Sequence, residues 1–420
     1  FFLDQRGSRP SFFQREMEKL DPEDCRGNRH FFGEGESFHT EYCQDHLPVR
    51  EQSDVVGHAV RAMYMYCAMA DVAAETGDRA LLRACKRLWT SVCEKRMYVT
   101  GGIGPSSHNE GFTADYDLPN PTAYAETCAA IGLVFWNHRL LQLECDGRYA
   151  DAMERALYNG VLSGVSLDGK RFFYENPLES AGDVHRQPWF ACSCCPPNIA
   201  RLVASFGQYV YSESRSEACV HLYVQGAGEL DLGGRKVVIE QKTGYPWKEK
   251  VVLTVRPREA STFTLALRIP GWCGRARAKL AGRSLPLAPL TRKGYARIKR
   301  RWNPGDTLEL TLPMPVERIE AHPAVAADAG RVALQRGPLV YCLEAVDNGA
   351  NLNDLTLPPK AKLGARFDQK LLGGVTVITA RGRRADRAAW SGDLYRPVGS
   401  RTKPATLKAV PYFAWDNRRQ

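Results

Sequence analysis

The chain has 420 residues, of which 44% are hydrophobic and 25% charged, a composition typical of a globular protein with a sizeable core. Its length favours two or three domains over a single one. No stretch approaches eighteen uninterrupted apolar residues, which argues against a membrane partner. The net charge of +10 arises mainly in the C-terminal half. There, basic residues alternate with apolar ones between 291 and 302, which indicates the solvent face of a strand rather than a nucleic-acid-binding module.

The cysteines carry information about the compartment. The chain has 13 of them, an odd number, and they do not form the dense framework of a small secreted domain. This pattern predicts a reducing, cytoplasmic location with thiols used for metal binding or catalysis. The sequence starts at Phe1 rather than at Met, so we expect it to be a fragment or an incomplete gene product.

The first half of the chain, up to about residue 213, reads as helical. Ser53 or Asp54 is predicted to cap a buried helix that runs to about Glu75 and contains His58. Further helices are predicted over residues 79–97, from Asn120-Pro121 onwards, over 147–162 and over 196–211. Successive helices of this kind predict helical hairpins that stack in sequence around an apolar interior.

After Ser212 the hydrophobic period changes from that of a helix to two residues. Leu265, Leu267 and Ile269, for example, alternate with more polar neighbours, and turn signals recur at intervals typical of short strands. We therefore predict antiparallel β-sandwiches over residues 214–317 and 318–420. In this prediction the last strand of the chain can also pair with the first sandwich. The fold class is thus multidomain α plus β.

The most informative stretch is Cys192-Ser-Cys-Cys-Pro-Pro-Asn198. Two prolines suit the first turn of a helix, so Cys194 and Cys195 are predicted at a helix N-terminus. The helix dipole favours thiolate over thiol there. Three cysteines within four residues indicate metal binding or catalysis, although small buried thiols of the core are the simpler alternative.

A second cluster of ligands lies in Tyr124-Ala-Glu-Thr-Cys-Ala129. Glu126 and Cys128 are two residues apart and would diverge around a regular helix, so both can hold one ion only at an irregular or terminal turn. With Cys194 and Cys195 they would offer one oxygen and three sulfurs, a tetrahedral zinc set. Spacing alone makes this a weak signal, because the ligands come from two distant segments.

Three other features have ordinary structural interpretations. Glu110 lies in a loop containing glycine and serine, where a solvated carboxylate is the default. His58, within the predicted helix, is by default a histidine whose polar atoms are satisfied in the core. Gly101-Gly-Ile-Gly104 resembles a phosphate loop only superficially and is interpreted as a tight turn, because the strand and helix that should flank it are missing.

Taken together, several motifs resemble glycoside hydrolase family 127, retaining β-L-arabinofuranosidases with a cysteine nucleophile held at a zinc ion. The resemblance covers nearly the whole chain. The segments that carry it are Gly57-His-Ala-Val-Arg-Ala-Met63, Val99-Thr-Gly-Gly-Ile-Gly104, Asn109-Glu-Gly-Phe112, Asp115-Tyr-Asp-Leu-Pro-Asn120, Ala123-Tyr-Ala-Glu-Thr-Cys-Ala129, Cys192-Ser-Cys-Cys-Pro196, Arg336-Gly-Pro-Leu339 and Pro411-Tyr-Phe-Ala-Trp415.

The resemblance implies a role for each matching residue. Cys194 matches the nucleophile and Glu110 the general acid/base. The Zn²⁺ ligands would be Glu126, Cys128, Cys194 and Cys195, and the residues near the sugar would be His58, Tyr174 and Cys192. The resemblance also implies that residues 1–213 are the C-terminal part of an (α/α)6 barrel, with further helices before Phe1. The expected partner is a plant-type glycan that contains arabinose, and a homo-oligomer is compatible with it.

Two alternatives to this hypothesis stay open at the level of sequence. Glu110 and Glu126 could form an ordinary pair of catalytic carboxylates, leaving the thiols to a structural zinc. Alternatively, the chain could be a non-catalytic or inactive fragment that only binds a glycan or a partner.

Overall fold

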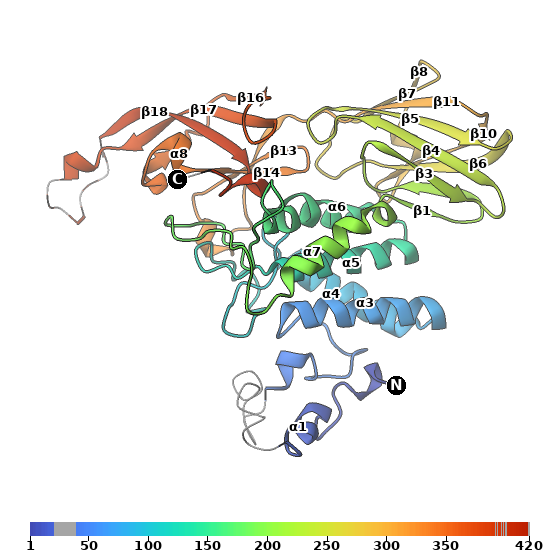
Figure 1. The fold of residues 1–420 in the computed structure, drawn as a ribbon, viewed down its shortest axis with the longest axis horizontal. Coiled ribbons are helices and arrows are strands. Elements are labelled where there is room, and N and C mark those ends of the chain that lie inside the picture. The colour runs from blue at the N-terminus through green and yellow to red at the C-terminus, as the bar shows by residue number, and fades with distance from the viewer. Residues whose placement is uncertain are drawn as a thin grey trace.

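A computed structural model describes residues 1–20, 39–390, 392, 394, 395, 397, 399 and 401–418. In Figure 1 the helices of the first half of the chain lie beneath two β regions, which stand side by side along the upper edge of the molecule. Among the described residues, no helix is long and apolar enough to cross a membrane.

The helices fall mainly in the first half of the chain, as the sequence predicts. Their bounds are α1 (Phe12–Met17), α3 (Ala59–Thr76), α4 (Arg79–Cys93), α5 (Thr127–Leu143), α6 (Gly147–Arg155), α7 (Cys195–Ala204) and, much later, α8 (Ala345–Asn348). Helices α3 to α7 share one hydrophobic core with the outer face of one sheet of the first β region, the face that points away from the interior of the sandwich. Fully buried aromatic and aliphatic side chains fill that core, and they include Met63, Leu88 and Trp136.

Two of the predicted helix starts are wrong. Helix α3 begins at Ala59 instead of near Ser53, because Gly57 has a left-handed backbone with φ 68°. A Cβ at Gly57 would lie 2.0 Å from the carbonyl oxygen of Glu41, so only glycine fits at this position, and its left-handed backbone interrupts the helix. His58 is therefore the N-cap of α3, whereas the sequence placed it inside the helix.

The helix expected from Asn120-Pro121 begins only at Thr127. The preceding residues instead bond to a neighbouring loop: the Tyr124 amide donates to the Pro105 carbonyl, and the Ala125 amide to that of Gly104. The other predicted helices are shorter than expected. After α6 the chain continues as the π-helical segment η4 (Ala156–Val161) and then as the 3-10 helix η5 (Leu162–Gly164). Helix α7 is followed by another short 3-10 helix, η6 (Phe206–Tyr209).

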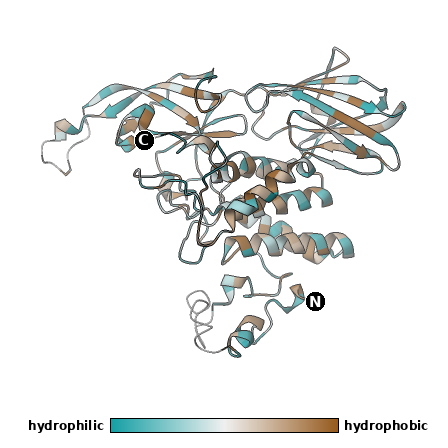
Figure 2. Ribbon diagram, viewed as in Figure 1, coloured by the Kyte–Doolittle hydropathy of each residue, from teal (hydrophilic) through white to brown (hydrophobic). Residues whose placement is uncertain are grey.

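The first β region is a sandwich of two sheets around a common core. One sheet has the order β1-β2-β6-β10-β9 and the other β3-β4-β5-β11-β7-β8, with β2 and β6 parallel and the remaining pairs antiparallel. Hydrophilic and hydrophobic bands alternate along these strands in Figure 2, as the period of two predicts. The strands are β1 (Tyr211–Glu213), β2 (Glu217–Val220), β3 (Gly226–Asp231), β4 (Lys236–Thr243), β5 (Lys250–Pro257), β6 (Ser261–Arg268), β7 (Arg277–Leu280), β8 (Arg283–Leu285), β9 (Thr291–Arg292), β10 (Tyr295–Trp302) and β11 (Asp306–Thr311).

The C-terminal strands differ from the prediction of a second sandwich. In the described part of the chain they form a single antiparallel sheet with the order β12-β13-β14-β18-β17-β15, and β16 pairs with β17. The last strand pairs with β14 and β17, so it stays in this sheet. The strands are β12 (Val316–Ile319), β13 (Ala333–Arg336), β14 (Leu339–Leu343), β15 (Leu355–Thr356), β16 (Leu363–Asp368), β17 (Val375–Ala385) and β18 (Thr402–Pro411).

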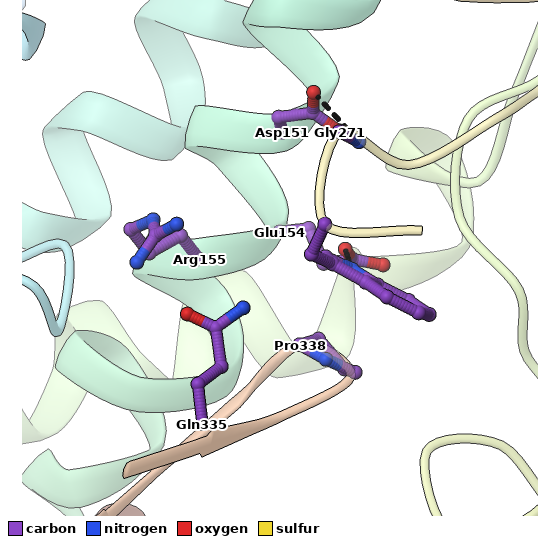
Figure 3. Close-up of a pocket in the computed structure, with 7 residues that line it drawn as sticks. Asp151, Glu154, Arg155, Gly271, Gln335 and Pro338 are labelled. Atoms are coloured by element: carbon purple, nitrogen blue, oxygen red, sulfur yellow. Dashed lines mark hydrogen bonds between the residues drawn. The ribbon is translucent and has the colours of Figure 1, made fainter. Parts of the chain in front are cut away.

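Helix α6 is the junction between the helices and both β regions. Arg268 of β6 is fully buried and pairs with Asp151 and Glu154 of α6. Beside this pair lies a cavity of about 90 Å³, lined from all three parts of the molecule. Figure 3 shows Gln335 and Pro338 from the C-terminal sheet facing the helix across this cavity.

Candidate metal and catalytic site

Glu126 and Cys128 meet at the start of α5 because the backbone changes direction there. Glu126 is the N-cap of the helix and has an extended conformation, with φ −56° and ψ 135°. Its side chain therefore does not follow the helical spacing that would separate it from Cys128. Both residues are buried. The terminal turn that the sequence required for a shared ion is present.

Cys194 and Cys195 occupy the N-terminus of α7, as predicted. Cys194 is the N-cap and Cys195 the first helical residue, and the prolines that follow lie in the first turn. Proline suits this position because its missing N–H would have no partner within the helix. Cys195 is fully buried, whereas Cys194 is only partly covered. Cys195 is thus shielded from solvent, whereas Cys194 is partly exposed.

The two helix starts bring four ligand atoms together. The carboxylate oxygen of Glu126 and the sulfurs of Cys128, Cys194 and Cys195 all lie within 4.8 Å of one another. Cys195 Sγ is 3.5 Å from Cys128 Sγ and 3.7 Å from Cys194 Sγ. Glu126 Oε1 is 3.5 Å from Cys194 Sγ and 3.7 Å from Cys195 Sγ. This cluster can hold a metal ion.

The electrostatics of the cluster favour a cation. Burial, reinforced by the neighbouring Cys194, raises the pKa of Glu126 to about 8. Its second oxygen, Oε2, is buried without a hydrogen-bond partner. Hydrogen bonds from Cys128 and Cys195 hold the pKa of the Cys194 thiol well below its usual range. A buried carboxylate beside a thiolate is costly unless a positive charge lies between them, and a metal ion supplies one.

Glu110 lies on a loop that is anchored tightly to the start of α3. The Phe112 amide donates to the Gly57 carbonyl, and the Ala59 amide donates to the carbonyl of Glu110 itself. Gly111 permits this approach, since a Cβ there would lie 1.8 Å from the Gly57 oxygen. The carboxylate of Glu110 is consequently held in place, and the default of a freely solvated loop residue is wrong.

Three donors surround the Glu110 carboxylate. His58 Nδ1 accepts the Val60 amide of α3, so its proton resides on Nε2, which lies 3.2 Å from Glu110 Oε2. The Tyr124 hydroxyl donates to Oε1 at 2.9 Å, and the Tyr42 hydroxyl to Oε2 at 3.4 Å. These hydrogen bonds, that of His58 above all, lower the pKa of Glu110. One histidine therefore caps a helix with one nitrogen and orients the carboxylate with the other.

Tyr174 connects the two halves of the site. Its hydroxyl lies 3.2 Å from Cys194 Sγ, and its ring centroid is 6.1 Å from that of Tyr124, which in turn bonds Glu110. Cys192 is exposed, with its sulfur 3.8 Å from the same hydroxyl. Two tyrosines thus line the surface between the sulfur cluster and the carboxylate.

All the residues singled out in the sequence fall in this one region. Sequence reasoning gave no role to Tyr42 and Tyr124. Tyr124 stands two residues before Glu126 in a motif already noted, which is a weak signal. Nothing in the sequence marks Tyr42, which comes from the short helix η3 (Thr40–Cys43), because its position depends on how that helix packs beside His58.

Comparison with known proteins identifies the class. Three family models match consecutive parts of the chain: "Beta-L-arabinofuranosidase, GH127 catalytic domain" at residues 1–208, the "GH127 middle domain" at 217–314 and the "Glycoside hydrolase family 127 C-terminal domain" at 316–420. The chain therefore belongs to glycoside hydrolase family 127.

Individual relatives agree with this assignment. The chain is 37% identical to a non-reducing end β-L-arabinofuranosidase of Bifidobacterium longum subsp. longum, over all of this chain and 65% of that protein. A crystal structure of a family 127 β-L-arabinofuranosidase from Geobacillus stearothermophilus T6 superposes with a TM-score of 0.93 and 53% identity, over 99% of this chain and 66% of that one. Another family 127 structure, described as a β-arabinofuranosidase, superposes with a TM-score of 0.84 and 40% sequence identity, over 90% of this chain and 61% of that one. The chain thus spans slightly under two thirds of these relatives.

Proposed function

We propose that this protein is a glycosidase that releases L-arabinofuranose from β-L-arabinofuranosides with retention of configuration. Cys194 is the nucleophile and Glu110 the general acid/base. The observation that carries the proposal is that two reactive groups lie in one region of a family 127 chain. The first is a partly accessible thiol with a lowered pKa, and the second is a carboxylate fixed by three donors. The substrate class follows from the β-L-arabinofuranosidase activity of the relatives.

The metal of the cluster is proposed to be zinc. In a tetrahedral site with Zn–S bonds of about 2.3 Å and a Zn–O bond of about 2.0 Å, two sulfurs lie about 3.8 Å apart and a sulfur and an oxygen about 3.5 Å apart. Four of the six distances within the cluster are 3.5–3.7 Å and fit this geometry, and all six are within 4.8 Å. The donor set of three thiolates and one carboxylate also suits zinc. When bound, the ion stabilises the thiolate form of the cysteines at neutral pH.

The reaction requires two steps from the chain's own residues. The Cys194 sulfur attacks the anomeric carbon while Glu110 donates a proton to the departing oxygen, giving a thioglycosidic bond to Cys194. Glu110, now a carboxylate, then takes a proton from water, which displaces the sulfur and releases the sugar. Tyr124 and His58 orient the carboxylate, and Tyr174 holds the sulfur beside the sugar.

The proposed enzyme has a helical domain followed by two β domains. We propose that residues 1–213 form part of an (α/α)6 barrel, followed by β domains at 214–317 and 318–420. The paired helices α3 with α4 and α5 with α6 support the barrel, because each pair is a hairpin with a short connection. The expected substrate is a plant-type glycan with terminal arabinofuranose, and self-association of the chain is compatible with this.

The first prediction tests the nucleophile. Replacing the attacking sulfur in Cys194→Ser should lower hydrolysis of an aryl β-L-arabinofuranoside by at least about 10³-fold. Some metal should remain, because three ligands persist. Rate measurements on zinc-loaded protein, with metal content by elemental mass spectrometry, check both expectations. Cys273→Ser, which changes a thiol in the core of the first sandwich and outside the site, is the matched control and should keep both metal and rate. Full activity in Cys194→Ser would rule out this mechanism, and an inactive but folded wild-type chain would favour the non-catalytic alternative.

Covalent labelling separates the cysteine mechanism from a carboxylate pair. A mechanism-based inhibitor of the arabinofuranoside type should attach to Cys194, because only a nucleophile bonds to the anomeric carbon. Peptide mass spectrometry locates the label. Attachment to Glu126 would instead support the pair of carboxylates. The packing of Glu126 among the cysteines argues against that outcome.

A further inference from the structure

A second pair of cysteines lies where the helices meet the first sandwich. Cys145 follows α5, and Cys219 lies on β2, yet their sulfurs are 3.2 Å apart. Cys219 belongs to the core that β2, β6 and β10 share with the helices. The chain on the Cys145 side is held against the same sheet, because the Gly147 amide donates to the Lys293 carbonyl. Neither cysteine belongs to the metal cluster described above.

A charged pair lies next to the two cysteines and bonds to both residues. Arg297 of β10 donates to the backbone carbonyl of Cys145 at 3.3 Å, and its guanidinium lies 3.5 Å from the carboxylate of Glu217. Glu217 and Cys219 are two residues apart on β2 and therefore share one face of the sheet. The Cys219 sulfur donates to Glu217 at 3.3 Å. The backbone of Cys145 and the thiol of Cys219 are thus both tied to one ion pair, formed between β10 and β2.

We propose that Cys145 and Cys219 are a site of reversible oxidation, which forms a disulfide between the helical part and the first sandwich. A disulfide bond is about 2.05 Å long, so the sulfurs need to approach by only about 1.2 Å. The sulfurs of Cys145 and Cys219 and a carboxylate oxygen of Glu217 also lie close enough together to suggest a metal site. The guanidinium of Arg297 at Glu217 argues against this, since it already supplies the positive charge that a metal ion would bring.

The two cysteines differ in the way that disulfide exchange requires. Cys145 is partly accessible and Cys219 is buried. Contact with Cys219, aided by the charge of Arg297, lowers the pKa of Cys145. The Cys145 thiolate attacks one sulfur of a low-molecular-weight disulfide and expels one thiolate. Cys219, losing its proton, then attacks the Cys145 sulfur and expels the second. Two protein thiols are oxidised and one small disulfide is reduced to two thiols.

The test uses the zinc-loaded chain treated with oxidised glutathione under native conditions. The expected result is a loss of about 2 Da without a lasting adduct, and a cross-linked peptide pair containing Cys145 and Cys219. Reductant should reverse both changes. The oxidised protein should also unfold at a higher temperature, because the cross-link closes a long loop. Cys145→Ser and Cys219→Ser should abolish the shift, whereas Cys273→Ser, which removes another buried thiol, should leave it intact.

Three results would overturn the proposal. Cys145 and Cys219 could both stay free, or each could carry a separate glutathione adduct with no cross-link. The wild-type chain could instead bind a second zinc that Cys145→Ser and Cys219→Ser both lose, which would make the cluster a metal site. Peptide mapping of the wild-type protein decides the first two outcomes even if a serine variant fails to fold.

Discussion

At the scale of single residues, the protonation of Glu110 sets the pH range of the proposed reaction. Its three donors lower the pKa, so the free site holds a carboxylate. The carboxylate is the form that the second step needs as a base. The first step needs the protonated form, whose population falls as the pH rises above the pKa. The rate of the first step should therefore decline toward alkaline pH.

His58→Asn tests this dependence. Asparagine is a good N-cap and should preserve the start of α3, while it removes the Nε2 donor facing Glu110. Because that hydrogen bond is the largest cause of the lowered pKa, its loss should raise the pKa of Glu110. The alkaline limb of the kcat/KM profile should then move to higher pH. Kinetics with a small aryl arabinofuranoside across the pH range provide the measurement.

Tyr42→Phe is the matched control for this experiment. It removes a longer contact to the same oxygen, 3.4 Å in place of 3.2 Å, without touching the helix cap. In this variant the alkaline limb of the kcat/KM profile should also move to higher pH, but by a smaller amount. An alkaline limb that stays in place in both variants would show that a group other than Glu110 controls the first step.

At the scale of elements, the close packing of α3 on α5 positions both halves of the site. His58 caps α3, and Glu126 and Cys128 stand at the start of α5. The helices approach closely because Gly132 of α5 faces Met63 of α3 without a side chain. A Cβ at Gly132 would lie 2.7 Å from the Cβ of Met63, which is too close for any rearrangement of the flexible end of that side chain to relieve.

Gly132→Ala should consequently destabilise the protein. In an open helix this change is favourable by up to about 1 kcal/mol, but overpacking in a core costs about 1–3 kcal/mol. We expect a net loss of about 1 kcal/mol in the free energy of unfolding, measured by urea titration. Gly207→Ala is the control, since nothing lies within 4 Å of its Cβ position. Equal stabilities of the two variants would contradict the proposed contact.

At the scale of the whole molecule, a buried ionic network ties the first sandwich to the helices. Glu154 receives hydrogen bonds from Arg268, from the Tyr245 hydroxyl at 2.6 Å and from the Trp272 indole at 3.1 Å. Asp151 receives a further bond from Arg268 at 2.9 Å. The guanidinium is fully buried, so its removal would leave the buried carboxylate of Glu154 without the cation that pairs with it.

Arg268→Met should therefore cost about 3–5 kcal/mol of unfolding free energy, because breaking a buried ion pair leaves an unpaired charge. Arg256→Met, on the neighbouring sheet, is the control. Its guanidinium is exposed and 3.4 Å from Glu240, a surface pair worth about 0–1 kcal/mol. Denaturant titration monitored by tryptophan fluorescence distinguishes the two. A similar small loss in both variants would indicate that the junction depends on apolar packing alone.

The sequence was sufficient for much of this description. It predicted the change from helices to strands near residue 213, because hydrophobic periodicity is a local property that follows from how each element buries one face. It also placed Cys194 and Cys195 at a helix start, since the two prolines after them fit few other positions. The eight candidate site residues came from motifs, and they all lie in one region.

The tertiary structure decided where helices begin and which groups meet. Ser53 and Asn120 look like caps locally, yet Gly57 and the loop at Gly104 take the backbone hydrogen bonds that a helix would need. The pairing of Cys145 with Cys219, and of Tyr42 with Glu110, joins segments far apart in the chain. Such contacts depend on how helices pack on sheets, and no spacing along the sequence encodes a distance in space.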